Sequence, residues 1–372
     1  MNSQTGHHPA IQNPEYIQTI LEGMGPLGDT YTNYKDHKIN VFGGIPGEEV
    51  IAQIVQYKRR RQHYISAIVT EVIKPSSHRV APPCPYFGPC TGCQWQHIDY
   101  SYQLQLKQEA VESQLEIYPD LRNIQVSPTV PYPKLYNYRN HARFSVRSQG
   151  SLGFVNRITR RFIKIDECII MAPEINKALS HLQGNCQETS QISVRYGINT
   201  SDMLIQPTLN SPTISLNSGQ PHYYENLLDS SFRISSPSFF QVNTTQTEKM
   251  AALMQARLQL TGSEVLVDAY AGVGTFTILF APFVRKIIAI EESGAAVKDA
   301  AVNTLGIRNL KFIESKTEEA LDNLDESVDA IILDPPRVGC HPDAIESTIR
   351  LGPKRILYIS CDPATLARDL NL

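Results

Sequence analysis

Three short apolar runs in the last third of the chain each end in a turn that carries polar or reactive residues. They read Val265-Leu-Val-Asp-Ala-Tyr270-Ala-Gly-Val-Gly274, Ile331-Ile-Leu-Asp334-Pro-Pro-Arg337 and Leu357-Tyr-Ile-Ser-Cys361-Asp-Pro. Short β-branched strands that alternate with helical stretches are typical of a doubly wound parallel sheet. Such sheets bind their ligands at the carboxyl ends of the strands. We therefore expect a glycine-rich turn, an aspartate and a cysteine at one edge of one sheet.

The pattern predicts a C-terminal Rossmann-like domain over residues 236–372. Its five strands are expected at 264–269, 286–291, 310–314, 328–333 and 355–360, joined by right-handed crossovers. A long amphipathic helix over Thr245–Leu260, closed by Gly262, is predicted to precede the first strand.

The rest of the chain is long enough for two further domains, since 372 residues exceed one ordinary core. Residues 10–75 read as a small β domain with strand-like runs at 50–57 and 64–73. Residues 76–235 read as a mixed α+β domain, with a helix near 100–116 and an antiparallel meander over 138–165. The chain is therefore predicted to be a multidomain α/β protein.

Composition indicates a folded protein of the cytoplasm, with 41% hydrophobic and 19% charged residues. No run of about 18 apolar residues occurs, as a membrane helix would need. The N-terminus, Met1–His8, lacks the basic and then apolar pattern of a signal peptide. We expect no membrane partner.

Positive charge is concentrated in two places, although the net charge is −3. Residues 133–164 hold eight Lys or Arg and no acid, and Lys58–Arg61 is a second basic block. Aromatic residues interleave with the first run, and this combination suits single-stranded RNA. The alternatives are a solvated hairpin for the second block and a buried sheet face for the aromatics, which we favour for Phe144 and Phe162.

Three of the seven cysteines, Cys84, Cys90 and Cys93, lie within ten residues, and Cys168 follows. Clustering of this kind in a cytosolic chain indicates a metal rather than disulfides. Four thiolates suit either a tetrahedral zinc or a [4Fe–4S] cluster, and spacing alone favours zinc as the commoner occupant. Cys186 and Cys340 have no partners in the pattern and read as ordinary thiols.

The glycine turn predicts a nucleoside cofactor. A G-x-G between strand and helix is a weak signal alone, but the next strand ends in Glu291, seventeen residues after Gly274. A carboxylate there can accept hydrogen bonds from both ribose hydroxyls while glycine lets the ligand approach the backbone. No phosphate-cradling run follows, which favours S-adenosylmethionine over NAD. The predicted cofactor-binding residues of this region are Tyr270, Gly272, Gly274, Thr275 and Glu291.

Cys361 indicates the class of reaction. Uracil C5 is too weak a nucleophile to attack a methyl sulfonium, but a thiolate that adds to C6 gives C5 carbanion character. A lone cysteine after a strand is usually a packing residue; its place after Asp334-Pro-Pro-Arg337 reverses that interpretation. Arg337 stands where amino-methyltransferases carry a stacking tyrosine. Asp334-Pro-Pro-Arg337 also occupies the place after the strand where cytosine-C5 methyltransferases carry a Pro-Cys motif.

Together these motifs resemble those of the RNA uracil-C5 methyltransferases. The resemblance implies an OB-like TRAM barrel that binds RNA over residues 10–75, and a [4Fe–4S] cluster rather than zinc on Cys84, Cys90, Cys93 and Cys168. It places Gln241, from Pro237-Ser-Phe239-Phe-Gln241-Val-Asn243, and Asp334 at the cofactor, and it makes Cys361 the nucleophile.

The domain content is most similar to the branch that acts on 23S ribosomal RNA, because bacterial tRNA-specific relatives lack the TRAM domain and the cluster. We expect a monomer. The alternatives are an RNA-binding protein with an inactive methyltransferase domain and a uridine-C5 methyltransferase acting on tRNA. The family's proton-abstracting glutamate lies well after the cysteine, whereas this chain ends eleven residues past Cys361. The resemblance therefore implies a C-terminal truncation.

Overall fold

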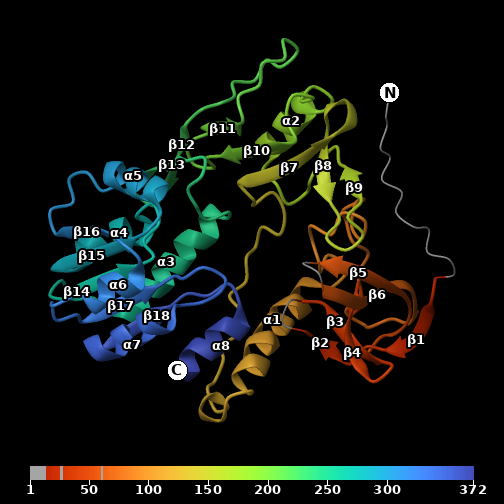
Figure 1. Ribbon diagram of the computed structural model, residues 1–372, viewed down its shortest axis with the longest axis horizontal. Helices are drawn as coiled ribbons and strands as arrows, with labels where there is room; N and C mark the ends of the chain where they lie inside the picture. The colour runs from red at the N-terminus through yellow and green to blue at the C-terminus, as the bar shows by residue number, and fades with distance from the viewer. Residues whose placement is uncertain (1–13, 26–27, 60–61) are drawn as a thin grey trace. The chain divides into compact units, whose positions relative to one another are not determined.

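The computed structural model describes residues 14–25, 28–59 and 62–372. The chain divides into two compact units (Figure 1). The first comprises Met1–Ser113, Val126–Thr129 and Asn156–Arg161, and the second comprises Gln114–Gln125, Val130–Val155 and Phe162–Leu372. No helix of the described ranges is long and apolar enough to cross a membrane.

The first unit is built on a six-stranded sheet in the order β1-β5-β6-β4-β3-β2. The strands are β1 (Tyr16–Ile20), β2 (Gly23–Met24), β3 (Thr30–Tyr34), β4 (His37–Phe42), β5 (Glu49–Arg59) and β6 (Gln62–Lys74). Neighbours run antiparallel except β4 and β6. The two strand-like runs predicted at 50–57 and 64–73 are confirmed as β5 and β6. Alternate residues of the sheet, among them Val41, Val50 and Ala67, form its buried core.

A buried ion pair between Glu48 and Arg79 joins the segment after β6 to this sheet. Glu48 is fully buried and accepts two hydrogen bonds from the Arg79 guanidinium, both at 2.6 Å. Arg79 also pairs with Ile98 in an isolated bridge, which closes the loop that carries the first three cysteines. The predicted helix follows as α1 (Tyr100–Leu115), whose first turn is capped by Asp99 through the Tyr102 N–H at 3.0 Å.

An antiparallel sheet opens the second unit, in the order β11-β10-β7-β8-β9. Its strands are β7 (His141–Arg147), β8 (Ser151–Val155), β9 (Phe162–Lys164), β10 (Gln191–Tyr196) and β11 (Met203–Gln206). The predicted meander is therefore confirmed. Phe144 is fully buried, as expected, whereas Phe162 is only half-buried. Helix α2 (Pro173–Leu182) buries Ile175 and Leu179 and packs on β10.

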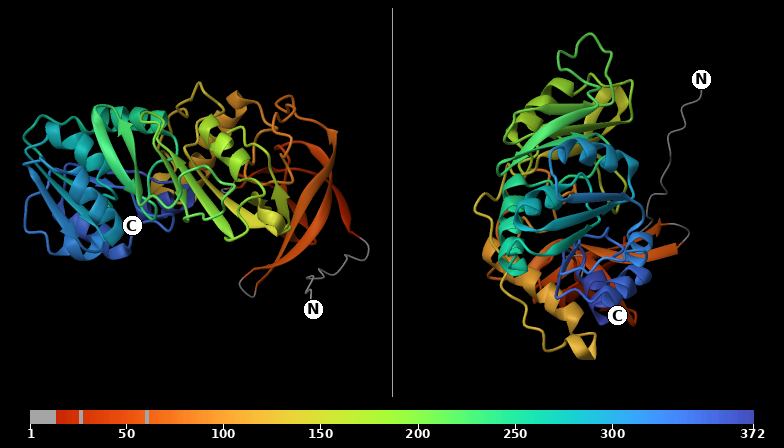
Figure 2. Two further views of the ribbon diagram at one scale, coloured as in Figure 1. Left: turned by 90° about the horizontal axis from the view of Figure 1, so that it is seen from above. Right: turned by 90° about the vertical axis from the view of Figure 1, so that its left-hand side faces the viewer.

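A hairpin of β12 (His222–Leu227) and β13 (Ser230–Ser235) lies between this sheet and a second, parallel one (Figures 1 and 2). Its apolar face forms one core with Leu204 of β11 and with Val273 and Ala296 of the C-terminal region. The two sheets of the second unit are thus joined by continuous apolar packing.

The parallel sheet has the order β16-β15-β14-β17-β18. Its strands are β14 (Val265–Ala269), β15 (Lys286–Glu291), β16 (Leu310–Glu314), β17 (Ala330–Leu333) and β18 (Arg355–Tyr358), and every neighbouring pair is parallel. All five predicted strands are confirmed, with bounds that differ by no more than two residues. Central strands β14 and β17 are buried along their whole length, as in a sheet covered on both faces.

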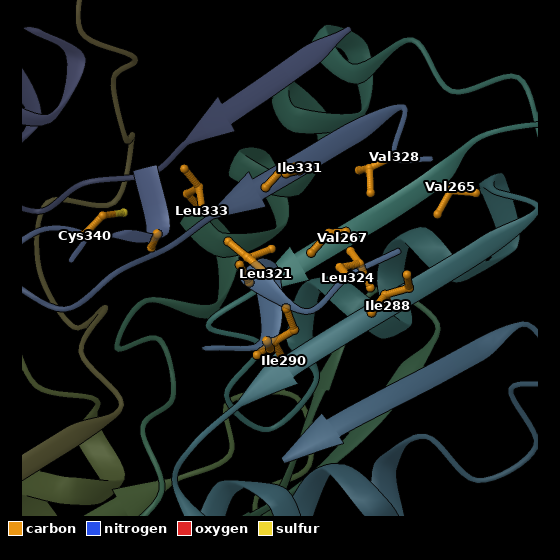
Figure 3. Close-up of a cluster of buried hydrophobic side chains, with 13 residues drawn as sticks. Val265, Val267, Ile288, Ile290, Leu321, Leu324, Val328, Ile331, Leu333 and Cys340 are labelled. Atoms are coloured by element: carbon orange, nitrogen blue, oxygen red, sulfur yellow. The ribbon is translucent and has the colours of Figure 1, made fainter. Parts of the chain in front are cut away.

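Helices cover both faces of this sheet. On one face α3 (Thr244–Leu258) and α4 (Thr275–Phe280) bury Leu266, Ile287 and Ile332. On the other, α6 (Thr317–Asp322) and α7 (Pro342–Leu351) cover the cluster that Figure 3 shows, with Val267, Ile290 and Ile331 at its centre. The remaining helices are α5 (Gly294–Asn303) and α8 (Pro363–Asn371).

The end of α3 differs from the prediction. The helix stops at Leu258, where Gln259 takes the left-handed conformation with φ 45° and donates its N–H to the Gln255 carbonyl. Gly262 was expected to close the helix, and that expectation was wrong. Gly262 instead forms a turn over Glu264, to which it donates its N–H at 3.1 Å.

Candidate active site

The predicted site residues follow neighbouring strands at one edge of the parallel sheet. Ala269 at the end of β14 pairs with Ile290 of β15 and with Leu333 of β17, and Leu333 pairs with Tyr358 of β18. Because these strands are parallel and in register, the segments that follow them begin at the same level. Glu291, the glycine turn, Asp334 and the loop with Cys361 therefore share one edge, as predicted.

The glycine turn after β14 depends on three residues with positive φ. Tyr270 has φ 70°, Gly272 has φ 57° and Gly274 has φ 87°, and Gly274 is the N-cap of α4, whose first residue is Thr275. A Cβ added to Gly272 would meet nothing within 4 Å, so space lies in front of its backbone. Glycine at this position keeps that approach open to a ligand.

Glu291 fastens the glycine turn to the next strand. One carboxylate oxygen accepts the N–H of Gly272 at 2.8 Å and the other accepts the N–H of Ser293 at 2.7 Å. A carboxylate offers about four acceptor positions. Glu291 is half-buried and so keeps capacity for a ligand's hydroxyl groups.

Two further carboxyl groups sit at the same edge in buried surroundings. Burial raises the pKa of Asp268 to about 7, and the charges of Asp334 and Glu291 act in the same direction. Asp268 accepts a hydrogen bond from the Thr277 hydroxyl at 2.5 Å through Oδ2, while its buried Oδ1 has no partner. Burial likewise raises the pKa of Asp334 to about 6. These acids favour an added positive charge at this edge.

The side chain of Tyr270 is partly buried. It packs on the hydrophobic cluster between the sheet and helices α6 and α7, beside the thiol of Cys340. Burial raises the pKa of its hydroxyl. The cofactor contact of Tyr270 stays a prediction, and its backbone, with φ 70°, shapes the turn.

The segment around Gln241 is held by its backbone. Asn140, which is buried, donates its side-chain amide to the Gln241 carbonyl at 3.1 Å and its N–H to the Val242 carbonyl at 3.0 Å. Phe240 is buried in the hairpin core, whereas the neighbouring Phe239 is 68% exposed. The anchoring leaves the Gln241 side chain half-buried and Phe239 open to a ligand.

Cys361 is exposed in the turn between β18 and α8. Asp362 is the N-cap of α8, and its carboxylate accepts the N–H groups of Ala364 at 3.0 Å and Thr365 at 3.3 Å. The Ser360 hydroxyl donates to the Asp362 carbonyl at 2.9 Å. These local bonds stiffen the turn and leave the thiol accessible.

One face of the antiparallel sheet is strongly basic. Along β7, His141, Arg143 and Arg147 alternate with the buried Ala142, Phe144 and Val146. His141 shows the effect of this charge, because burial and then the charges of Arg195, Arg139 and Arg143 lower its pKa to about 3. It therefore stays neutral and contacts the Ser193 hydroxyl at 3.0 Å. Such a face attracts a polyanion.

Part of the basic run over residues 133–164 does not belong to the second unit. Residues 156–161 belong to the first unit, where Arg157 pairs with Asp29 at 2.5 Å. Of the block Lys58–Arg61, residues 60 and 61 lie outside the described residues, and the side chains of Lys58 and Arg59 are not described either.

The predicted metal ligands are divided between the units. Cys84, Cys90 and Cys93 lie on the loop of the first unit, and Cys168 belongs to the second. Burial raises the pKa of Cys90, and the neighbouring Cys93 and Cys84 raise it further. Within residues 14–25, 28–59 and 62–372, no three His, Cys, Asp or Glu side chains form a group that could hold a metal ion. Four thiols are donors that suit a metal ion or an iron–sulfur cluster.

Comparison with known proteins identifies the family. The profile of the tRNA (uracil-5-)-methyltransferase family matches residues 227–372. An uncharacterized RNA methyltransferase of Synechocystis sp. is 30% identical, with 98% of this chain and 90% of the relative covered. One from Listeria monocytogenes is also 30% identical, with 98% and 92% covered. The chain belongs to the RNA uracil-C5 methyltransferase family.

A solved structure shows the same fold. The tRNA (uracil-54, C5)-methyltransferase of Pyrococcus abyssi, determined in complex with S-adenosyl-L-homocysteine, superposes with a TM-score of 0.74. Its sequence is 22% identical, and the match covers 95% of this chain and 93% of that one. The superposition confirms the predicted fold of mixed α/β sheets. The family and its relatives confirm the predicted enzyme class, an RNA (uracil-C5-)-methyltransferase.

Proposed function

We propose that the protein methylates C5 of a uridine in 23S ribosomal RNA, using S-adenosylmethionine and a covalent bond between Cys361 and C6 of the base. One observation carries the proposal: the exposed Cys361 follows β18, which neighbours β17, and β17, which precedes Asp334, in turn neighbours β14, which precedes the glycine turn. The S-adenosyl-L-homocysteine in the Pyrococcus abyssi enzyme supports the choice of cofactor.

The proposed reaction begins when the Cys361 thiolate adds to C6 of the uracil. The C5–C6 π electrons move toward the C4 carbonyl, and the resulting enolate is nucleophilic at C5. Bound S-adenosylmethionine supplies the methyl group, and the neutral thioether S-adenosylhomocysteine is the leaving group. A base then takes the C5 proton, the C6–S bond breaks and the thiolate returns. We assign no residue to that base.

The chain's own groups would hold the cofactor at the sheet edge. Glu291 would accept the ribose hydroxyls, and the backbone at Gly272 and Gly274 would lie against the ligand. Burial raises the pKa values of Asp268 and Asp334 and so disfavours their carboxylate forms, and a cation beside them would lower these pKa values again. A sulfonium at this edge would provide that charge.

RNA would be bound by the basic face of β7 and by residues 10–75. The face of β7, with Arg143 and Arg147 exposed, supports contacts to phosphates. Residues 10–75 are proposed to act as a TRAM domain, which the six-stranded sheet supports. Cys84, Cys90, Cys93 and Cys168 are proposed to hold a [4Fe–4S] cluster, and the enzyme to act as a monomer in the cytoplasm.

The test is methyl transfer to separate RNA transcripts. Purified protein is incubated with labelled S-adenosylmethionine and transcripts of 23S ribosomal RNA or of tRNA, and the nucleosides are analysed by mass spectrometry. We expect 5-methyluridine in the 23S transcript and none with Cys361→Ala. Label in tRNA alone would support the second candidate, which the name of the Pyrococcus abyssi enzyme favours. Binding without transfer to either RNA would indicate an inactive methyltransferase domain.

A further inference from the structure

A buried carboxylate on α8, Asp369, accepts hydrogen bonds from three different groups. Its Oδ2 accepts the backbone N–H of Cys340 at 2.8 Å and the hydroxyl of Tyr358 at 2.5 Å. Its Oδ1 accepts the guanidinium of Arg368 at 2.7 and 2.5 Å. Asp369 is only 5% exposed, so these contacts form in surroundings that strengthen them.

The ion pair of Arg368 and Asp369 leaves no room for a side chain at Gly339. A Cβ there would lie 2.5 Å from Asp369 Oδ2 and closer still to the Arg368 guanidinium. Gly339 also has φ 81°, and Arg368 donates to the Val338 carbonyl at 2.8 Å. The loop after Asp334-Pro-Pro-Arg337 is therefore closed directly onto α8 by its backbone.

The residues that contact Asp369 are close in sequence to Cys361 and Asp334, the groups placed at the reaction site. Tyr358 is the last residue of β18, three residues before Cys361, and Cys340 follows Asp334 by six residues. In Figure 3 the Cys340 side chain lies beyond Leu333, at the carboxyl end of the cluster. Tyr270 and Tyr358 both lie against the Cys340 thiol. Asp369 thus connects the end of β18 to the segment that follows β17, and Tyr270, from the turn after β14, packs against the same Cys340.

We propose that Asp369 is a positioning residue that fixes the Cys361 loop against the Asp334 loop. The inference rests on the proposed function, because it assumes that Cys361 attacks a base bound beside Asp334. Asp369 would act through Tyr358 and Cys340 and would not touch the substrate. Displacing a reacting group by about 1 Å can lower a rate about 100-fold. Because Asp369 would hold the Cys361 loop in place, its loss should slow the addition of the Cys361 thiolate to C6.

A trapped adduct measures that step. In RNA transcribed with 5-fluorouridine, Cys361 can add to C6 and C5 can take the methyl group, but fluorine cannot leave as a cation. The methylated protein–RNA adduct then persists and is counted by denaturing electrophoresis. Tyr358→Phe removes one donor to Asp369 and leaves the ring, and Asp369→Asn replaces the carboxylate by an amide of similar shape.

The control is a carboxylate that joins the same strands at their amino ends. Asp329 accepts the Val265 N–H at 3.0 Å and an ammonium hydrogen bond from Lys354 at 3.2 Å. Asp329→Asn therefore weakens a comparable contact between strands at the opposite edge of the sheet. Adduct rates at saturating RNA and cofactor, the Kd for S-adenosylmethionine and the Tm are measured for all variants.

We expect Tyr358→Phe and Asp369→Asn each to slow adduct formation at least about tenfold, with the Kd for S-adenosylmethionine changed less than about twofold. The double variant should be slowed less than the product of the two effects, because both act through one contact. Asp329→Asn should lower the Tm without slowing the adduct. If Asp369→Asn does not fold, the adduct rate of Tyr358→Phe alone tests the inference.

Two results would overturn the inference. The first is wild-type rates in both variants, and the second is slowing that Asp329→Asn reproduces at an equal loss of Tm. No adduct from the wild type on ribosomal or transfer RNA would overturn the proposed function together with this inference. A wild-type adduct that the variants leave unchanged would overturn the inference alone.

Discussion

Glu291, the last residue of β15, accepts the backbone N–H of Gly272 at 2.8 Å. The bond joins two residues nineteen apart whose spacing in the sequence predicts that both bind one cofactor. The acid and the glycine turn therefore form one structure before any ligand binds. Such preorganisation lowers the entropy lost when a ligand binds.

Replacing Glu291 should weaken cofactor binding. We expect Glu291→Ala to reduce the affinity for S-adenosylmethionine by about 1.5–3 kcal/mol, the range for hydrogen bonds to a charged group. Calorimetric titration measures the affinity of each variant for S-adenosylmethionine. Glu314→Ala is a matched control, because Glu314 ends β16, pairs with Glu291 and is exposed. Equal losses in both variants, or wild-type binding of NAD in place of S-adenosylmethionine, would contradict the assignment.

The basic face of β7 should contribute salt-dependent affinity for RNA. Arg143→Ala and Arg147→Ala should each reduce the slope of log K against log salt by about one unit if each contacts a phosphate. Filter binding with ribosomal RNA over a range of salt concentrations measures the slope. Arg257→Ala removes the same charge from the exposed end of α3 and should leave the slope unchanged. A slope that is the same in all variants would exclude this face from binding.

Strand positions were predictable because their signal is local. Each strand of the parallel sheet is a short β-branched run between polar turns, and the sheet order then aligns Glu291, Asp334 and Cys361 at one edge. The end of α3 was not predictable, since Gln259 adopts a left-handed conformation usually taken by glycine.

The buried polar contacts were also hidden from the sequence. Asp369 follows the Ser-Cys-Asp-Pro motif closely, but its donors come from Cys340 and Tyr358 on other segments. A pattern of residue types cannot show such long-range pairs. Asp268 had a usable signal, because an acid inside the apolar run Val265–Ala269 must be buried with β14. Tyr270 faces the core for a similar reason, since an aromatic ring after a buried strand finds apolar neighbours there.

The cysteines should determine the metal content. Anaerobically purified protein is expected to contain iron and sulfide and to absorb light at about 400 nm through thiolate-to-iron charge transfer. Cys84→Ser should lower the iron content, whereas Cys186→Ser, which changes a buried thiol outside the predicted set, should not. Elemental analysis measures both. Colourless protein with one zinc per chain would show that the site is a zinc site.

Asp268 should make the stability of the ligand-free protein fall as the pH rises. Its folded-state pKa, raised mainly by burial to about 7, exceeds the unfolded value of about 3.9. The folded protein therefore holds a proton that the unfolded chain has lost, and the stabilisation this gives at low pH disappears as the pH passes 7. Asp268→Asn cannot titrate. Between pH 5.5 and 8 the wild type should lose about 2 kcal/mol relative to this variant.

Urea unfolding at the two pH values measures the difference. Asp329→Asn is the control, because the Val265 N–H and then Lys354 lower the pKa of Asp329. A lowered pKa stabilises the folded state above the unfolded value and loses that effect only in acid, so Asp329→Asn should cost the same at pH 5.5 and pH 8. If Asp268→Asn behaves in that way too, Asp268 is ionised in the folded protein across this range. Its Oδ1 would then need a partner that compensates for the buried charge.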